Sequence, residues 1–221
     1  MKSFFVIGSL LFSALLTFAQ NEQAPIIEKE IAYKDWTYTN PRTGGDINLR
    51  EFTKGKKLTI VVYYAPWCPN WRFDAPMLER FHQKYKDQGL AVIGVGEYDP
   101  VESMKNNLDF LKVTFPTVYE SEERAAKQKT LHYEYRTSTG DLRSWGSPWY
   151  IMLTPSLTEK KGDVLTKKTF VVNGEIIASD GETFIRKSLG LPAIDPKAAT
   201  ANRGKIEVCD PDTKIAELKK P

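Results

Sequence analysis

Residues 58–76 read LTIVVYYAPWCPNWRFDAP, and this stretch decides the predicted fold. It begins with an uninterrupted run of β-branched, aliphatic and aromatic residues, which is typical of a strand buried on both faces. Apolar side chains then recur every three or four positions over about 69–88, and this spacing predicts an amphipathic helix. Gly89 ends that helix, because glycine adopts a positive φ angle freely. Cys68 therefore lies where a buried strand passes into a long helix.

The rest of the chain continues this alternation of strand-like and helix-like segments. The dipeptide Asn173-Gly174 favours a tight turn, so 175–178 should pair back on the preceding strand as a hairpin. We expect the other strands at about 90–95, 115–119, 148–153 and 169–172, and the other helices at about 99–111, 121–133 and 182–189. This order predicts an α/β fold, a three-layer α/β/α sandwich around a mixed central β-sheet.

Residues 1–19 have the pattern of a secretory signal peptide. One lysine precedes an apolar run from Phe4 to Phe18, and small residues stand where such peptides are cleaved. The run is shorter than the roughly 20 apolar residues of a membrane-spanning helix. We therefore expect a secreted or periplasmic protein without stable membrane insertion, and the alternative is a retained N-terminal anchor. The folded domain is predicted over 20–191 and a tail of uncertain order over 192–221.

The composition excludes several classes of protein. Lysine plus arginine is 31 against 28 for aspartate plus glutamate, so the net charge is only +3. So small an excess cannot neutralise the phosphates of a nucleic acid. The chain has two cysteines and two histidines, too little material for a zinc site. We expect no metal, no cofactor and no nucleic-acid partner, and we predict that His82 and His132 are solvated.

Cys68 is the candidate nucleophile of this chain. A cysteine at a helix N-terminus faces unpaired backbone N–H groups and the positive end of the helix dipole. Both favour the thiolate, which is the form that attacks a disulfide or a peroxide. Arg72, about one turn further along the helix, adds positive potential. The position of Cys68 alone therefore indicates thiol chemistry.

In this stretch the chain resembles the extracytoplasmic thioredoxin-like redoxins, of the TlpA-like and AhpC/TSA-related kind. In that family a strand runs into Trp-Cys-x-x-Cys, followed by arginine and then by an acidic residue, any residue and proline. The matching residues of this chain are Trp67, Cys68, Pro69, Arg72, Asp74 and Pro76. The resemblance extends over about 30–190 and implies a thioredoxin-like domain. It also implies that Pro148 is the family's cis-proline, which lies across from the nucleophile and helps to shape the groove for a substrate peptide.

One position departs from the family pattern. The second cysteine of the motif would fall at position 71, where this chain has Trp71. In a dithiol site the second thiol releases the mixed disulfide, so a self-contained dithiol cycle at this motif is excluded. Two interpretations keep the redox chemistry: Cys68 is a lone thiol resolved by another molecule, or Cys209 resolves it from the tail. In the third, Trp67 and Trp71 form an aromatic surface for a partner, without redox chemistry.

Other residues near the motif allow two interpretations each. A peroxiredoxin-like thiol peroxidase would place threonine three residues before the cysteine, where Ala65 stands, and this weakens that alternative. Asp74 either assists proton transfer or is a solvated carboxylate near the helix start. Glu97 either relays protons or is a surface carboxylate. Aromatic residues flank Pro148 and either line the groove that faces Cys68 or belong to the core: Trp145, Trp149 and Tyr150.

We therefore predict a thiol–disulfide oxidoreductase that uses Cys68 as a single nucleophilic thiol. Its expected partners are protein thiols or disulfides, or a low-molecular-weight thiol. The residues predicted to shape the substrate groove are Trp67, Pro69, Trp71, Arg72, Asp74 and Pro148. The alternatives are a non-catalytic module that binds a partner and a thiol-dependent peroxidase.

Overall fold

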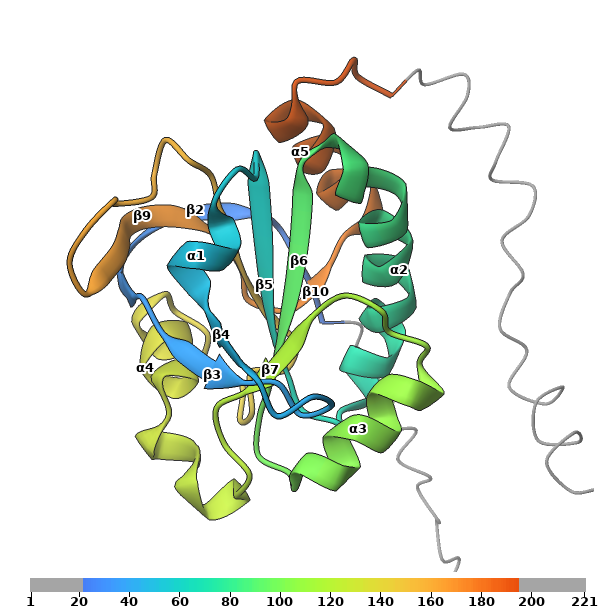
Figure 1. Ribbon diagram of the computed structural model, residues 1–221, viewed down its shortest axis with the longest axis vertical. Coiled ribbons are helices and arrows are strands. Elements are labelled where there is room, and N and C mark those ends of the chain that lie inside the picture. Colours follow the sequence, from blue (N-terminus) through green and yellow to red (C-terminus); the bar gives the residue numbers. More distant parts are fainter. Residues whose placement is uncertain (1–21, 195–221) are drawn as a thin grey trace, which may run out of the picture.

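A computed structural model describes residues 22–194 of the chain (Figure 1). Its strands are β1 (Gln23–Ala24), β2 (Ile27–Lys34), β3 (Thr37–Thr39), β4 (Asp46–Asn48), β5 (Leu58–Tyr64), β6 (Leu90–Gly96), β7 (Thr117–Tyr119), β8 (Trp149–Leu153), β9 (Val164–Val172) and β10 (Glu175–Ile176). Its α-helices are α1 (Leu49–Thr53), α2 (Pro69–Tyr85), α3 (Val101–Phe110), α4 (Leu131–Ser138) and α5 (Ala178–Leu189), and its 3-10 helices are η1 (Lys86–Gln88) and η2 (Arg124–Lys129). The predicted signal peptide at 1–19 lies outside the described residues, as does most of the predicted tail. Within 22–194, none of the helices has the length and apolar character needed to cross a membrane.

Eight of the strands form one mixed sheet in the order β2-β9-β8-β5-β6-β7-β3-β4. β5 pairs in parallel with β6, and β6 with β7, whereas β8 runs antiparallel to β5 and to β9. Every residue of β5 and β6 is buried, as an uninterrupted apolar run predicts for strands covered on both faces. The parallel centre of the sheet therefore comes from the strand–helix–strand order of the sequence.

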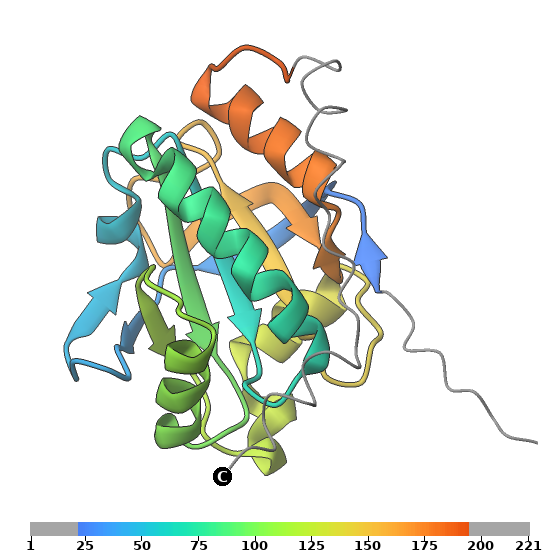
Figure 2. The same ribbon diagram turned by 90° about the vertical axis from the view of Figure 1, so that its right-hand side faces the viewer.

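Helices cover both faces of this sheet. α2, α3 and α5 lie on the face turned toward the viewer in Figure 2, and α1 and α4 lie on the other face. One core contains Trp71 of α2, Leu108 of α3 and Ile185 of α5. The second core contains Leu49 of α1 and Tyr135 of α4. The predicted three-layer α/β/α sandwich is confirmed.

The predicted hairpin after Asn173-Gly174 is wrong. β10 pairs in parallel with β1 and forms a separate two-stranded sheet. A Cβ at Gly174 would overlap the carbonyl oxygen of Glu22, so only glycine permits this close approach. The N–H of Glu175 then donates to the same oxygen at 3.0 Å. The N-terminal strand thus takes the place of the expected hairpin partner.

The helix predicted over 121–133 is divided into two elements. η2 ends at Lys129, and α4 begins at Leu131. Thr130 stands between them in extended conformation, and its hydroxyl accepts the N–H of Tyr133, which caps α4. This division brings two separate segments to the end of the sheet where Cys68 lies.

Candidate active site

Cys68 is the N-cap residue of α2 and follows closely after the central strand β5. Pro69 takes the first helical position, where its missing N–H is tolerated because that group has no partner inside the helix. The structure therefore places Cys68 at the strand-to-helix junction that the sequence indicates. The residue is only 7% exposed, so its sulfur is nearly enclosed.

The sulfur faces a backbone carbonyl group. Cys68 Sγ lies 3.1 Å from the carbonyl oxygen of Ser147 and donates its S–H to that oxygen. Within the described chain, its side chain makes no capping hydrogen bond to α2. A carbonyl oxygen can only accept, so the sulfur is the donor in this contact. The sulfur thus has a specific partner in the loop before Pro148, in addition to its place at the start of α2.

The loop that carries Pro148 lies across from Cys68. The Ser147–Pro148 peptide bond is cis, and Pro148 is buried. The Ser147 hydroxyl accepts the N–H of Ala65 at 2.9 Å, and Arg143 donates to the Pro148 carbonyl oxygen at 2.8 Å. The structure thus brings Cys68 and Pro148 together from distant parts of the sequence.

Trp71 is a core residue. It is fully buried, stacks on Tyr64 with ring centroids 4.5 Å apart, and donates its Nε1–H to Asn107 Oδ1 at 2.9 Å. The amide of Asn107 in turn donates to the carbonyl oxygen of Pro66 at 3.0 Å, which ties α3 to the motif. The expectation that Trp71 lines a groove, or forms an aromatic surface with Trp67, is wrong because the indole fills the interior beneath the motif.

A groove of about 430 Å³ opens between the start of α2 and α3. Trp67 and Arg72 line it from the motif, and Phe110 lines it from α3. Phe110 is 77% exposed, and Phe73, which follows Arg72, is 74% exposed. Pro69 is also exposed. The surface next to Cys68 is therefore mainly apolar and carries one positive charge, that of Arg72. This composition suits contact with another protein.

Two tryptophans meet beside Cys68. Trp67 and Trp145 are in edge-to-face contact, with ring centroids 5.1 Å apart. Arg124 lies 4.8 Å above the Trp67 ring, and Lys127 lies 4.4 Å above the Trp145 ring. Sequence patterning did not predict these contacts. The feature of the sequence that could have indicated them is the three-residue spacing of the two cations on η2. The other aromatic candidates, fully buried in the sheet core, are Trp149 and Tyr150.

Asp74 is buried, and the expectation of a solvated carboxylate is wrong. Its Oδ2 accepts from the Tyr150 hydroxyl at 2.5 Å and from the Ile176 N–H at 2.9 Å. Burial raises the pKa of this carboxyl to about 7, although both hydrogen bonds favour the charged form. Its two partners lie on β8 and β10, so Asp74 ties α2 to both sheets.

Three other titratable side chains lie deeper than their sequence context indicates. Glu97 is fully buried, so its interpretation as a surface carboxylate is wrong, and burial raises its pKa well above the ordinary range. Its carboxylate oxygens have no hydrogen-bond partner among residues 22–194.

His132 is fully buried and His82 is half-buried, and burial lowers the pKa of both imidazoles. Across the described part of the chain, no group of three His, Cys, Asp or Glu side chains could hold a metal ion.

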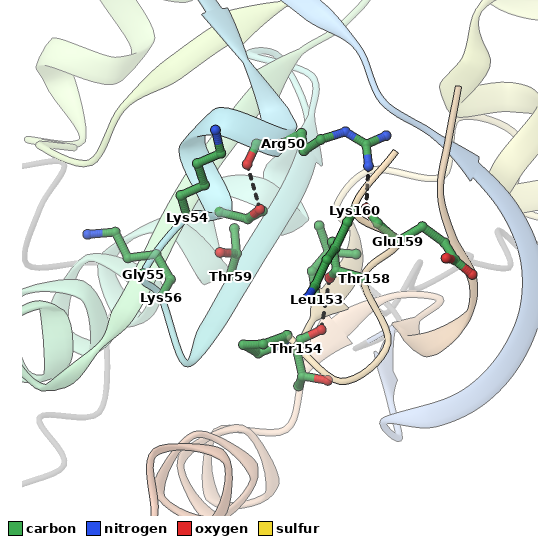
Figure 3. Close-up of a pocket in the computed structure, with 12 residues that line it drawn as sticks. Arg50, Lys54, Gly55, Lys56, Thr59, Leu153, Thr154, Thr158, Glu159 and Lys160 are labelled. Atoms are coloured by element: carbon green, nitrogen blue, oxygen red, sulfur yellow. Dashed lines mark hydrogen bonds between the residues drawn. The ribbon is translucent and has the colours of Figure 1, made fainter. Parts of the chain in front are cut away.

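A cavity of about 600 Å³ lies beside the start of β5 (Figure 3). Cys68 follows the other end of that strand. It is bounded by α1, the start of β5 and the segment after β8. Two of the cations on its wall are paired, Arg50 with Asp35 at 3.0 Å and Lys54 with Glu51 at 2.6 Å. The cavity is separate from the site at Cys68 because the two lie at opposite ends of β5.

The AhpC/TSA family matches residues 23–177, which is more than half of the chain. The chain therefore belongs to the AhpC/TSA family, and its fold is that of a thioredoxin-like redoxin.

Curated relatives match shorter parts of the chain. The thiol-disulfide oxidoreductase ResA of Halalkalibacterium halodurans is 29% identical over 75 residues, which cover 34% of this chain and 42% of that protein. The protein disulfide-isomerase of Drosophila melanogaster is 29% identical over 87 residues, which cover 38% of this chain and 16% of that protein. This chain thus spans less than half the length of either relative.

Solved structures share the fold over most of the described chain. A thiol:disulfide interchange protein of the thioredoxin family from Chlorobium tepidum has a TM-score of 0.51 at 17% identity, covering 73% of this chain and 98% of that chain. A secreted thiol-disulfide isomerase from Corynebacterium glutamicum has a TM-score of 0.52 at 16% identity, covering 74% of this chain and 92% of that chain. At these identities the likeness shows the thioredoxin-like fold alone.

Proposed function

We propose that this protein is an extracytoplasmic thiol–disulfide oxidoreductase that uses Cys68 as its single nucleophilic thiol. The observation that carries the proposal is the position of Cys68 at the start of α2, with its sulfur 3.1 Å from the carbonyl oxygen that precedes cis-Pro148. A substrate segment that docks in extended form along this loop would present its own sulfur at the same place. The buried indole of Trp71 occupies the position of a second thiol, so the chemistry uses one sulfur.

Two exchange steps describe the proposed reaction. First, the Cys68 thiolate attacks one sulfur of a substrate disulfide, a new S–S bond forms, and the other substrate sulfur leaves as a thiolate. Second, the thiolate of a low-molecular-weight thiol or of a protein attacks the substrate sulfur in this mixed disulfide. Cys68 then leaves as a thiolate with its electron pair. The number of disulfide bonds is unchanged, so the cycle needs no cofactor.

The location outside the cytoplasm rests on the N-terminal sequence. Residues 1–19 have the pattern of a signal peptide, which leaves a redoxin domain over 20–191 and a tail over 192–221. The names of related proteins, among them a secreted thiol-disulfide isomerase, agree with this location. In such a compartment, mixed disulfides persist long enough to be exchanged.

Cys209 is a second candidate for the resolving thiol, and it lies outside the described residues. α5 ends beside the start of β5, where Lys57 donates to the carbonyl oxygen of Leu189 at 3.1 Å. This is the end of the sheet opposite Cys68. The chain from 194 to 209 can span about 50 Å, at roughly 3.3 Å per residue, so its length allows Cys209 to reach the site.

A partner-binding module without catalysis is the alternative, and one observation favours it. Cys68 is only 7% exposed and its sulfur donates to a carbonyl oxygen, an arrangement that would also suit an inert thiol. The peroxidase alternative has less support, because Ala65 supplies no hydroxyl at the position where a threonine would order the peroxide.

A mixed disulfide test separates these functions. In the mature protein with Cys209→Ser, we expect glutathione disulfide to add one glutathione at Cys68, because the thiolate form of a cysteine attacks disulfides. Intact mass spectrometry should show this adduct, and dithiothreitol should remove it. Cys68→Ser in the same background should take up none. A folded protein that takes up glutathione only after unfolding in urea would establish the binding module instead.

A further inference from the structure

A buried imidazole connects α4 to the loop that faces Cys68. His132, the second residue of α4, is fully buried and stacks on Tyr63 with ring centroids 4.8 Å apart. Its Nε2 lies 3.1 Å from the carbonyl oxygen of Gly146, and its Nδ1 lies 2.9 Å from the hydroxyl oxygen of Tyr98. Both ring nitrogens therefore have a partner inside the protein.

These partners assign the proton of the ring. A carbonyl oxygen only accepts, so Nε2 carries the hydrogen and donates to Gly146. Nδ1 then accepts from the hydroxyl of Tyr98. Burial, together with the guanidinium groups of Arg136 and Arg143, lowers the pKa of His132 well below its ordinary range. The imidazole is therefore neutral, in one tautomer and one orientation.

Tyr98 is held in an uncommon backbone conformation. Its φ angle is 63°, a left-handed value that large aromatic residues rarely adopt. Its N–H donates to the carbonyl oxygen of Ser121 at 2.8 Å, and its ring packs against Trp145 with centroids 5.5 Å apart. Such a conformation persists only where surrounding contacts fix it. The turn after β6 is thus built so that the Tyr98 hydroxyl meets His132.

α4 holds the same loop at a second point. Arg136 donates to the carbonyl oxygen of Ser144 at 3.1 Å. Gly146 has a φ angle of 57°, and a Cβ at this position would overlap the Arg136 side chain. The next residue is Ser147, whose carbonyl oxygen accepts the S–H of Cys68. The position of the acceptor at the sulfur is therefore set from α4.

We propose that His132 is a positioning residue of the Cys68 site, because its Nε2–H holds the Gly146 carbonyl and so fixes the Ser147 carbonyl that accepts the S–H. The inference deepens the proposed function and rests on it for substrate exchange. Releasing the loop has two opposite effects. The sulfur loses an acceptor that only the thiol form can use and opens to small reagents, whereas a substrate peptide loses the ordered loop on which it docks.

His132→Phe in the mature protein with Cys209→Ser tests this role. Phenylalanine keeps a ring against Tyr63 but cannot donate to the loop. At neutral pH we expect iodoacetamide to alkylate Cys68 about fivefold faster in this variant than in the parent protein. We expect a peptide disulfide to exchange with Cys68 about fivefold more slowly. Each factor corresponds to the loss of about one hydrogen bond. The acceleration should not grow in low concentrations of urea, because a local loop opening exposes little surface.

His82→Phe is the matched control. His82 is half-buried in the last turn of α2, so this variant makes the same chemical change away from the loop. Both rates should equal those of the parent protein. Tyr98→Phe is a second test variant that removes only one hydroxyl and does not depend on His132→Phe folding. It should move both rates in the same directions by about twofold, because Nδ1 loses its donor. Imidazole ¹⁵N NMR should show a proton on Nε2 alone in the parent protein, because the Gly146 carbonyl oxygen can only accept.

The outcomes are distinct. A faster alkylation with a slower exchange, both insensitive to low urea, supports positioning. Unchanged rates in folded His132→Phe protein would overturn it, as would an acceleration that grows steeply with urea, because that dependence reports global unfolding. If the parent protein itself does not exchange with the peptide disulfide, the proposed function fails. The alkylation rates and the NMR spectrum then still decide the role of His132.

Discussion

Trp71→Cys is expected to lower the free energy of unfolding by about 3–5 kcal/mol, the range for truncating a large buried aromatic side chain. The indole is fully buried and stacked on Tyr64, so a small side chain leaves a cavity beneath the motif. Asn107 also loses the N–H that its Oδ1 accepts, and an unpaired buried acceptor adds to the cost. Urea unfolding of both proteins under reducing conditions measures the difference.

The same substitution should supply the missing resolving thiol. Side chains three positions apart in a helix lie about 5–6 Å from each other at Cβ, close enough for a disulfide after a small adjustment. We expect the oxidised variant to contain a disulfide that involves Cys68 and to reduce disulfide substrates faster than the parent protein. The reason is that a thiol one turn away releases the mixed disulfide without waiting for a second molecule. A turbidity assay of insulin reduction measures the gain.

Trp71→Phe is the matched control for both effects. It keeps an aromatic ring against Tyr64 but supplies neither an N–H for Asn107 nor a thiol. Its loss of stability should be smaller than that of Trp71→Cys, and its reductase activity should not rise. If a folded Trp71→Cys protein keeps both thiols free under oxidising conditions, position 71 is not the resolving position of this site.

The sequence predicts those parts of the fold whose signal is local. β5 and α2 follow from an uninterrupted apolar run and from three- and four-residue spacing, and both signals lie within one segment. The place of Cys68 at their junction follows in the same way. The alternation of strands and helices then predicts the layers, because a parallel pair of strands needs a crossover.

The parts that sequence patterning missed depend on distant partners. Trp71 is interior and its N–H is satisfied there by Asn107 of α3, and no pattern near the motif indicates that pairing. Asp74 lies in the second turn of α2, where the sequence allows a solvated carboxylate, yet its oxygen accepts from Tyr150 and Ile176 in the interior. The group that accepts from the Cys68 sulfur is likewise a backbone carbonyl. Every residue has such a carbonyl, so the identity of the residue does not indicate this contact.

Asp74→Asn is expected to remove a pH dependence of stability of about 4 kcal/mol, an order-of-magnitude value from a shift of about three pKa units. The Asp74 carboxyl has a pKa of about 7 in the folded protein against an ordinary value of 3.8, chiefly because of burial. The folded state thus holds this proton more tightly than the unfolded chain. The stabilisation is complete below the ordinary pKa and is lost as the pH rises through about 7.

The measurement is the difference in unfolding free energy between the parent protein and Asp74→Asn, taken by urea unfolding at several pH values from acid to slightly alkaline. The parent should lose stability relative to the variant as the pH rises, because asparagine stays neutral and its oxygen can still accept from Tyr150 and Ile176. Tyr150→Phe should move the loss to higher pH, since it removes a donor that favours the carboxylate. A difference that stays constant over this pH range would mean that the Asp74 carboxyl titrates alike in the folded and unfolded states. The bonds from Tyr150 and Ile176 would then have to offset the whole cost of its burial.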